Sequence, residues 1–190
     1  DVCSSDLGVP FLGDWLSKGY VIVAPDYAGL GTGGVHRYLV GDEAARDVFN
    51  LTRAARSIKA TQAGNDLVVV GWSQGGQAAL FSGEIGRAYA PETHLGAIVG
   101  IAPGATIMFS GIDGFFRSPV PYVYLIGQSY IDAYGLDRKV FTDAGQQLLD
   151  ASRQGCVVSL FSSLRQSAAP GVTKNISDDK KWIDALTRND

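Results

Sequence analysis

The segment DLVVVGWSQGGQAALFSGEIGRAY, residues 66–89, constrains the fold more than any other part of the chain. The continuous apolar run Leu67–Val70 is typical of a strand buried on both faces of a parallel sheet. It leads through Gly71-Trp72-Ser73-Gln74-Gly75 into a helix-forming stretch that reaches about Tyr89, and Pro91 marks its end. Small neighbours at Gly71, Gly75 and Gly76 allow strand and helix to approach closely. The sequence therefore predicts a strand, a sharp turn and a helix.

Ser73 stands at the centre of this turn, in the pattern G-x-S-x-G. A serine in that context is held with its hydroxyl exposed above the sheet edge, where it can act as a nucleophile. The pentapeptide alone is weak, since a chain rich in Gly and Ser contains it by chance, so the prediction depends on the flanking strand and helix. The alternative is a structural turn serine. We expect a nucleophile elbow made by Gly71, Trp72, Ser73 and Gly75, and acyl transfer from an ester as its chemistry.

Two further apolar runs predict strands on either side of the first, at Tyr20–Ala24 and Ala97–Ala102. Helical patterns separate the three runs, as in a βαβαβ sheet with right-handed crossovers. The first of these helices has acidic residues in its opening turn and apolar residues at helical spacing, namely Asp42, Glu43, Val48, Leu51, Ala55 and Ile58. The predicted fold class is α/β. A sheet of only three strands should leave its edges and one apolar face uncovered.

From Gly104 onward the sequence mixes aromatic and polar residues and no longer contains continuous apolar runs typical of buried strands. This change predicts a second, mainly helical region. One helix carries the stripe Val123, Ile126, Tyr130 and Tyr134, and another begins at Thr142 and Asp143 and carries Leu148, Leu149 and Ser152. A strand over Val120–Ile126 is the alternative. The aromatic residues are expected to pack internally and only secondarily to contact an acyl chain; they are Phe115, Phe116, Tyr122 and Tyr124.

The first seven residues, DVCSSDL, are what GAC GTG TGC TCT TCC GAT CT would encode, and that string resembles the end of a sequencing adapter. We expect residues 1–7 to be an artefact of this origin, with a genuine polar terminal loop as the alternative. The predicted organisation is then 1–7 as artefact, 8–104 as the α/β core and 105–190 as the helical region. If residues 1–7 are an artefact, Cys3 is not part of the natural protein and Cys156 has no partner cysteine in the chain. Cys156 then either pairs with a cysteine outside this chain or is an inert buried thiol.

Composition excludes several classes of protein. The formal net charge of −3 over 190 residues gives no reason to expect nucleic-acid binding. No apolar stretch reaches the length of a transmembrane helix. No Cys and His cluster has zinc spacing, and the Gly29–Gly34 stretch lacks the spacing of a dinucleotide loop. We therefore expect no metal and no cofactor.

Four segments taken in order carry a resemblance to a known family: GYVIVAPDYAGLGTGGVHRYLVG, DEAARDVFNLTRAARSI, VVVGWSQGGQAAL and AYAPETHLGAIVGIAPG. Together they resemble the secretory lipases of fungi and actinobacteria, a branch of the α/β-hydrolases. The resemblance implies a secreted carboxylic-ester hydrolase that acts on triacylglycerols or shorter acyl esters and can contact a lipid interface, with a helical cap inserted into a partial α/β-hydrolase fold. It implies Ser73 as the nucleophile and the backbone N–H of Gln74 as one oxyanion-hole donor.

The resemblance leaves the rest of a catalytic triad unassigned. In α/β-hydrolases the acid and then the histidine follow the serine along the chain, and the sequence holds only His36 and His94. His36 precedes Ser73 and is expected to be a structural loop residue. His94 is expected at the opposite sheet edge from the nucleophile. No acid is convincing: Asp26 is expected to cap a turn, and the others to be solvated or helix-capping, namely Asp113, Asp132, Asp137, Asp143 and Asp150.

The sequence therefore predicts that the triad acid and histidine lie outside this chain and that the chain alone is almost inactive, because a serine without its base is a poor nucleophile. Two rivals remain open. A related acyltransferase or polysaccharide-side esterase would use the same serine with a different acceptor or pocket. A non-catalytic α/β-hydrolase-like binding protein would lack the acid and histidine altogether.

Overall fold

The computed structural model describes residues 8–105, 111–153, 160, 162, 164 and 171–190. These residues form two compact units. The first consists of residues 8–31 and Gly41–Pro103, and the second of Thr32–Val40 and the described residues of Gly104–Asp190. Both cysteines lie outside the described residues. None of the described helices is long and apolar enough to cross a bilayer.

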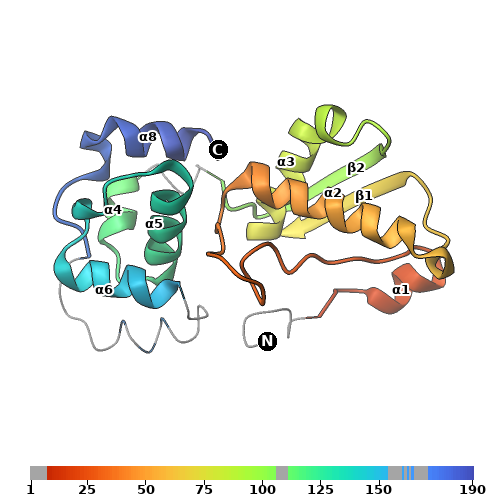
Figure 1. Ribbon diagram of the computed structural model, residues 1–190, viewed down its shortest axis with the longest axis horizontal. Coiled ribbons are helices and arrows are strands. Elements are labelled where there is room, and N and C mark those ends of the chain that lie inside the picture. The colour runs from red at the N-terminus through yellow and green to blue at the C-terminus, as the bar shows by residue number, and fades with distance from the viewer. Residues whose placement is uncertain (1–7, 106–110, 154–159, 161, 163, 165–170) are drawn as a thin grey trace. The chain divides into compact units, whose positions relative to one another are not determined.

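In the first unit one long helix packs on a small parallel sheet, a second long helix packs on the first, and a short helix precedes both (Figure 1). Its elements are α1 (Leu12–Ser17), α2 (Gly41–Ser57), η1 (Lys59–Thr61), β1 (Asp66–Trp72), α3 (Gln74–Tyr89) and β2 (His94–Ile101). The strands run parallel, with Asp66 opposite His94 and Trp72 opposite Ile101. Helix α3 connects them and packs on both strands and on α2. The βαβ unit predicted around Ser73 is confirmed.

The predicted strand at Tyr20–Ala24 is wrong. Within the described residues the sheet contains only β1 and β2, and residues 20–24 belong to no helix or strand. Tyr20, Val21 and Val23 are exposed. A strand exists through its hydrogen bonds to a neighbour about 4.8 Å away. The apolar pattern of this run is that of a strand, but no described segment pairs with it.

One face of the sheet is covered and the other is bare. Val69 on β1 is buried on the covered side, which faces α3. The other side exposes the side chains of Val68, Val70, Trp72, Val99 and Ile101. The uncovered apolar face expected from the sequence is therefore present. Alternation of buried and exposed side chains along β1 follows the two-residue period of a strand.

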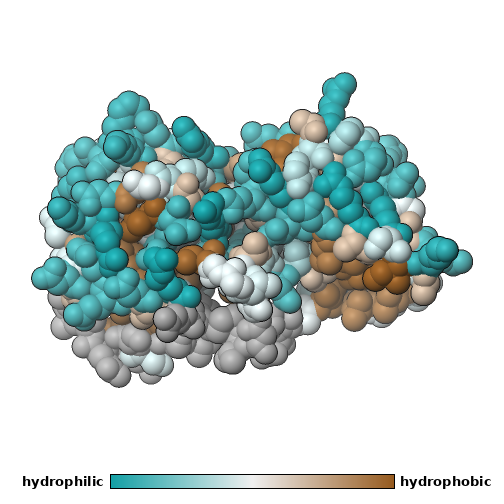
Figure 2. Space-filling model, viewed as in Figure 1, coloured by the Kyte–Doolittle hydropathy of each residue, from teal (hydrophilic) through white to brown (hydrophobic). Residues whose placement is uncertain are grey.

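Helix α1 adds a second exposed apolar area to the first unit. It buries none of its residues, and Phe11, Leu12 and Leu16 are exposed. Figure 2 shows hydrophobic surface over this part of the unit. Exposed apolar surface of this kind marks a place where another element, a partner protein or a lipid surface can bind.

Helix α2 turns a different face inward from the one predicted. Its acidic opening turn with Asp42 and Glu43 is as expected. Of the predicted apolar positions only Ala55 is buried, and Ile58 lies beyond the helix and is 56% exposed. The buried side is centred on Ala45 and Phe49. Most of the residues on the buried side of α2 are small, because α2 packs closely on α3. Phe49 is the exception, and its ring lies against Gly86 of α3.

The second unit is built from short helices around an aromatic core. Its elements are α4 (Ile112–Arg117), α5 (Pro121–Tyr134), η3 (Arg138–Val140), α6 (Asp143–Ser152), η4 (Ile176–Asp178) and α8 (Lys180–Thr187). At the centre, the rings of Phe116, Phe141 and Trp182 contact one another with centroids 5.8 to 6.3 Å apart. All three are at most 1% exposed. Aromatic groups of this size dominate the apolar area that such a unit buries.

Helices α5 and α6 confirm two sequence predictions. Helix α5 covers the Val120–Ile126 region that was open between helix and strand, so the strand alternative is wrong. Its predicted stripe lies inward, with Val123, Ile126 and Tyr130 buried. Helix α6 begins as expected after Thr142, whose hydroxyl accepts a hydrogen bond from the N–H of Gly145 (3.1 Å). A helical second region is therefore present.

Candidate active site

Ser73 occupies the turn between β1 and α3 in a backbone conformation that an L-residue rarely adopts, with φ 55° and ψ −116°. Such a conformation costs on the order of 1–3 kcal/mol and persists only when the surroundings enforce it. The Ser73 N–H donates to the carbonyl of Ile101 at the end of β2 (3.0 Å), and its carbonyl accepts from the N–H of Gln77 in α3 (3.1 Å). The strained strand-to-helix turn predicted from the sequence is therefore present.

Two of the three glycines around Ser73 are required by close packing. A Cβ at Gly71 would collide with the backbone of Gly75. A Cβ at Gly76 would come within 2.9 Å of both the Ile101 carbonyl oxygen and the Cα of Pro103. Gly75 differs, because a Cβ there would meet nothing closer than the Tyr27 hydroxyl at 3.9 Å. The expectation that all three glycines serve the strand–helix approach is correct for Gly71 and Gly76 and wrong for Gly75.

Gln74, the predicted oxyanion donor, is the first residue of α3. Its backbone N–H therefore lies at the N-terminal end of the helix, where the helix dipole favours negative charge. Trp72, the last residue of β1, is 65% exposed on the bare face of the sheet. The four elbow residues and Gln74 thus meet at the carboxyl end of β1, where ligands bind in open α/β sheets.

Tyr27 adds a side chain that the sequence did not single out. It lies in the segment before α2 with a positive φ of 61°, and its hydroxyl is close to Gly75 in the first turn of α3. Burial, and secondarily the charge of Asp47, raises the pKa of Tyr27 to about 12. The phenol therefore stays protonated at the pH values at which ester hydrolases work.

The two histidines are not brought to Ser73 within the first unit. His94 opens β2 opposite Asp66, the first residue of β1, whereas Ser73 follows the last residue of β1. The prediction that His94 lies at the opposite sheet edge is therefore confirmed. Its Nδ1 lies 2.7 Å from a carboxylate oxygen of Asp66, with both side chains exposed. His36 belongs to the second unit, where its ring contacts that of Tyr38 with centroids 6.0 Å apart.

Asp26 does not cap its turn in the predicted way. In an Asx turn its carboxylate would accept the N–H of Ala28, two residues on. That N–H donates instead to Oδ2 of Asp47 in α2, at 2.8 Å. Asp26 itself is exposed. A helix carboxylate, distant in sequence, therefore holds this loop.

Of the acidic residues predicted to be solvated or helix-capping, Asp137 is a helix cap as expected, whereas Asp113, Asp132 and Asp150 have side-chain partners. Asp113 accepts two hydrogen bonds from Ser177, and the hydroxyl bond, followed by the backbone bond, lowers the pKa of Asp113. Asp137 caps η3 by accepting from the N–H of Lys139. Asp132 pairs with Arg37 at 3.3 Å, and Asp150 with Arg138 at 3.0 Å.

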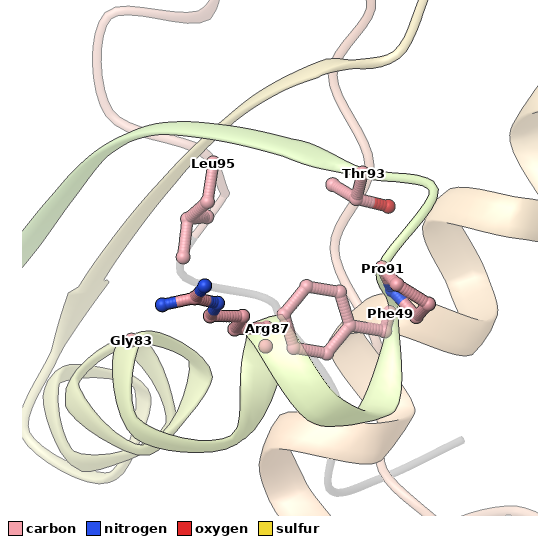
Figure 3. A pocket seen from close by; sticks show the side chains of 7 residues that line it. Phe49, Gly83, Arg87, Pro91, Thr93 and Leu95 are labelled. Carbon is pink, nitrogen blue, oxygen red and sulfur yellow. The ribbon is translucent and has the colours of Figure 1, made fainter.

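A pocket of about 410 Å³ lies in the first unit, at the other end of the sheet from Ser73 (Figure 3). Its lining comes from α2, α3, the turn after α3 and the start of β2, and consists of Phe49, Gly83, Gly86, Arg87, Pro91, Thr93 and Leu95. The Phe49 ring fills its floor and is 1% exposed. Leu95 is the second residue of β2, six residues before Ile101. This pocket therefore does not adjoin the elbow.

A sequence profile of the secretory lipase family matches residues 4–187 of the chain. The chain belongs to the secretory lipase family. The match spans both units, so it covers the elbow of the first unit and the helices of the second. The recognition of this family from the four ordered segments of the sequence is confirmed.

A secreted triacylglycerol lipase of Malassezia furfur, LIP4, is 25% identical to this secretory lipase chain over 167 residues. The aligned region covers 85% of the chain and 30% of the Malassezia protein. The chain thus spans about 30% of the length of that relative. No solved structure matches the chain.

Proposed function

We propose that this chain supplies the serine nucleophile of a secreted carboxylic-ester hydrolase of the lipase type, which degrades lipid esters. The observation that carries the proposal is the strained backbone of Ser73 between β1 and α3. Strain of this kind gathers at functional sites, where the fold enforces it. Membership of the secretory lipase family and the lipase named among its relatives support ester hydrolysis as the reaction.

The proposed reaction has two steps. The Ser73 Oγ attacks the ester carbonyl carbon, and the resulting tetrahedral intermediate expels the alcohol to leave an acyl-enzyme. Water then attacks the acyl group, the carboxylic acid departs, and the Ser73 hydroxyl is restored. The N–H of Gln74, at the N-terminal end of α3, is the proposed donor to the oxygen that becomes negative in both steps.

The proton of Ser73 needs a base that the described first unit does not place beside it. His94 lies at the far end of the sheet. The bare sheet face and the unpaired run at residues 20–24 indicate that further chain packs on this unit. We therefore propose that the triad acid and histidine are contributed by chain outside these 190 residues, and that the 190 residues alone are almost inactive. With further strands from that outside chain added to the sheet, the proposed complete fold is an α/β-hydrolase.

The second unit is the proposed cap of the enzyme. Its buried aromatic core gives it a structure of its own, while Tyr122 is 43% exposed on α5 and Phe115 is half-buried on α4. These two rings are the proposed acyl contacts. A cap of this kind shapes the pocket and excludes water from the acyl-enzyme.

The test is a panel of substrates assayed with the secreted lipase that contains this chain and, separately, with the 190 residues alone. We expect the lipase to hydrolyse emulsified triacylglycerol and p-nitrophenyl esters but not the matching anilides. We expect the isolated chain to fall short of it by about a million-fold, which is the cost of losing a triad in one well-studied serine hydrolase. Full esterase activity of the isolated chain would contradict the proposed outside histidine. No ester hydrolysis by the lipase itself would contradict the proposed function.

A further inference from the structure

The loop that contains Tyr27 approaches the first turn of α3 near Gly75. On the β2 side, Ser73 is fixed by its bond to Ile101, and Gly76 lies against Ile101 and Pro103. The Tyr27 hydroxyl is the nearest group that a Cβ at Gly75 would meet, at 3.9 Å. The phenol therefore borders the first turn of α3, with room for a methyl group between them.

The loop is itself strained and is tied down by one carboxylate. Tyr27 has φ 61°, in the left-handed region that a bulky residue rarely adopts. The next residue, Ala28, donates its N–H to Oδ2 of Asp47 at 2.8 Å. Asp47 lies in the middle of α2, nineteen positions further along the chain. The strained corner therefore depends on a hydrogen bond from another element rather than on its own sequence.

We propose that Asp47 is a positioning residue for the Ser73 nucleophile, acting through the Ala28 N–H and the Tyr27 side chain. The inference rests on the proposed function of Ser73 and extends it to α2. Asp47 anchors the Tyr27–Ala28 corner, the corner places the phenol beside the first turn of α3, and the phenol limits how far that turn, which follows Ser73, can be displaced toward the loop. Small displacements matter here, since a shift of about 1 Å in a reacting group can cost about 100-fold in rate.

The experiment compares Asp47→Ala with Asp47→Asn in the secreted lipase that contains this chain. Alanine removes the acceptor for the Ala28 N–H, whereas the asparagine amide oxygen can still accept it. We expect Asp47→Ala to lower kcat by about 10-fold or more at an almost unchanged KM, and Asp47→Asn to stay within about 3-fold of the parent. Asp42→Ala is the matched control, because Asp42 lies in the first turn of the same helix and pairs with the exposed Arg46; it should leave kcat unchanged.

Three results would overturn the proposal. These are an unchanged kcat in folded Asp47→Ala, a loss in Asp47→Asn as large as in Asp47→Ala, and an equal loss in the Asp42→Ala control. If Asp47→Ala does not fold, Tyr27→Phe decides, because it removes only the oxygen that lies near Gly75. We then expect a fall in kcat of about 3-fold or more at constant KM, and an unchanged kcat rejects the proposal. Ser73→Ala in the same series separates the two claims, since its full activity would reject the proposed function itself.

The phenol also gives a reading that does not depend on activity. Because the pKa of Tyr27 is raised to about 12 by burial, the neutral phenol stabilises the fold fully below the ordinary tyrosine pKa of about 10. That contribution is lost as the pH rises through about 12. Both Asp47→Ala and Asp47→Asn remove the charge that contributes to this raised pKa, so the two variants are compared with each other. A Tyr27 released only in Asp47→Ala should ionise at a lower pH there than in Asp47→Asn, measured as tyrosinate absorbance at alkaline pH. Identical titrations of the two variants would show that the Ala28 hydrogen bond does not hold the phenol, and would also overturn the proposal.

Discussion

Replacement of Ser73 by alanine should lower ester hydrolysis by the secretory lipase that contains this chain by about 10⁴-fold to 10⁶-fold. The reason is chemical, because the alanine side chain has no oxygen to form the acyl-enzyme. The fold should be retained, since the bond from the residue 73 N–H to Ile101 uses only the backbone. Initial rates on a soluble p-nitrophenyl ester, with circular dichroism of the same preparation, measure both quantities.

His94→Ala is the matched control for this loss. His94 is an exposed histidine that pairs with Asp66 at the far end of the sheet, so its removal should change kcat/KM by less than about 2-fold. A Ser73→Ala protein that keeps its activity would contradict the assignment of the nucleophile. A His94→Ala protein as inactive as Ser73→Ala would contradict the proposal that the catalytic histidine lies elsewhere.

Gly71→Ala should be the most damaging small substitution in the first unit. Its methyl group would overlap the backbone of Gly75, and neither β1 nor α3 can move away without breaking its packing. We expect the free energy of unfolding to fall by about 3 kcal/mol or more, at the upper end of overpacking costs. Chemical denaturation of the lipase, followed by tryptophan fluorescence, measures the change.

Gly75→Ala provides the comparison at the other glycine of the G-x-S-x-G pattern. A methyl group there meets only the Tyr27 hydroxyl at 3.9 Å, which is an ordinary contact. Gly75 is the second residue of α3 and has no positive φ, so alanine should be neutral or stabilising by up to about 1 kcal/mol. Equal destabilisation by the two substitutions would contradict the packing described for the elbow.

The elements around Ser73 could be predicted from the sequence because local signals there agree with the tertiary structure. The run Leu67–Val70 marks β1, the glycines mark the turn, and α3 ends at Tyr89 just before Pro91. The same holds for α6, where Thr142 acts as the predicted cap. In each case the residue that forms the local structure also fits the packing, which is the condition under which sequence patterns are reliable.

The remaining features depend on contacts that a local pattern does not contain. The run at residues 20–24 has the composition of a strand, but strand formation depends on a neighbour. The inward face of α2 is decided by its close approach to Gly86 on α3. The contact of Asp47 could not be predicted from the sequence, because an acidic residue within a helix normally faces solvent. Asp47 instead accepts a hydrogen bond from the N–H of Ala28, which is distant in sequence. The glycines after Tyr27 indicated a loop, but not the positive φ of the tyrosine itself.

The central claim is that Ser73 is the nucleophile, and covalent labelling tests it most directly. The secretory lipase that contains this chain would be treated with a p-nitrophenyl alkylphosphonate, digested with trypsin and sequenced by mass spectrometry. Trypsin releases residues 60–87 as one peptide, which contains Ser73 and also Ser82. Ser82 is fully buried and donates to the Ala78 carbonyl at 2.7 Å, so it serves as an internal control. We predict one phosphonyl group, on Ser73, with loss of activity in proportion to labelling. Loss of activity with the label on any other residue would contradict the account.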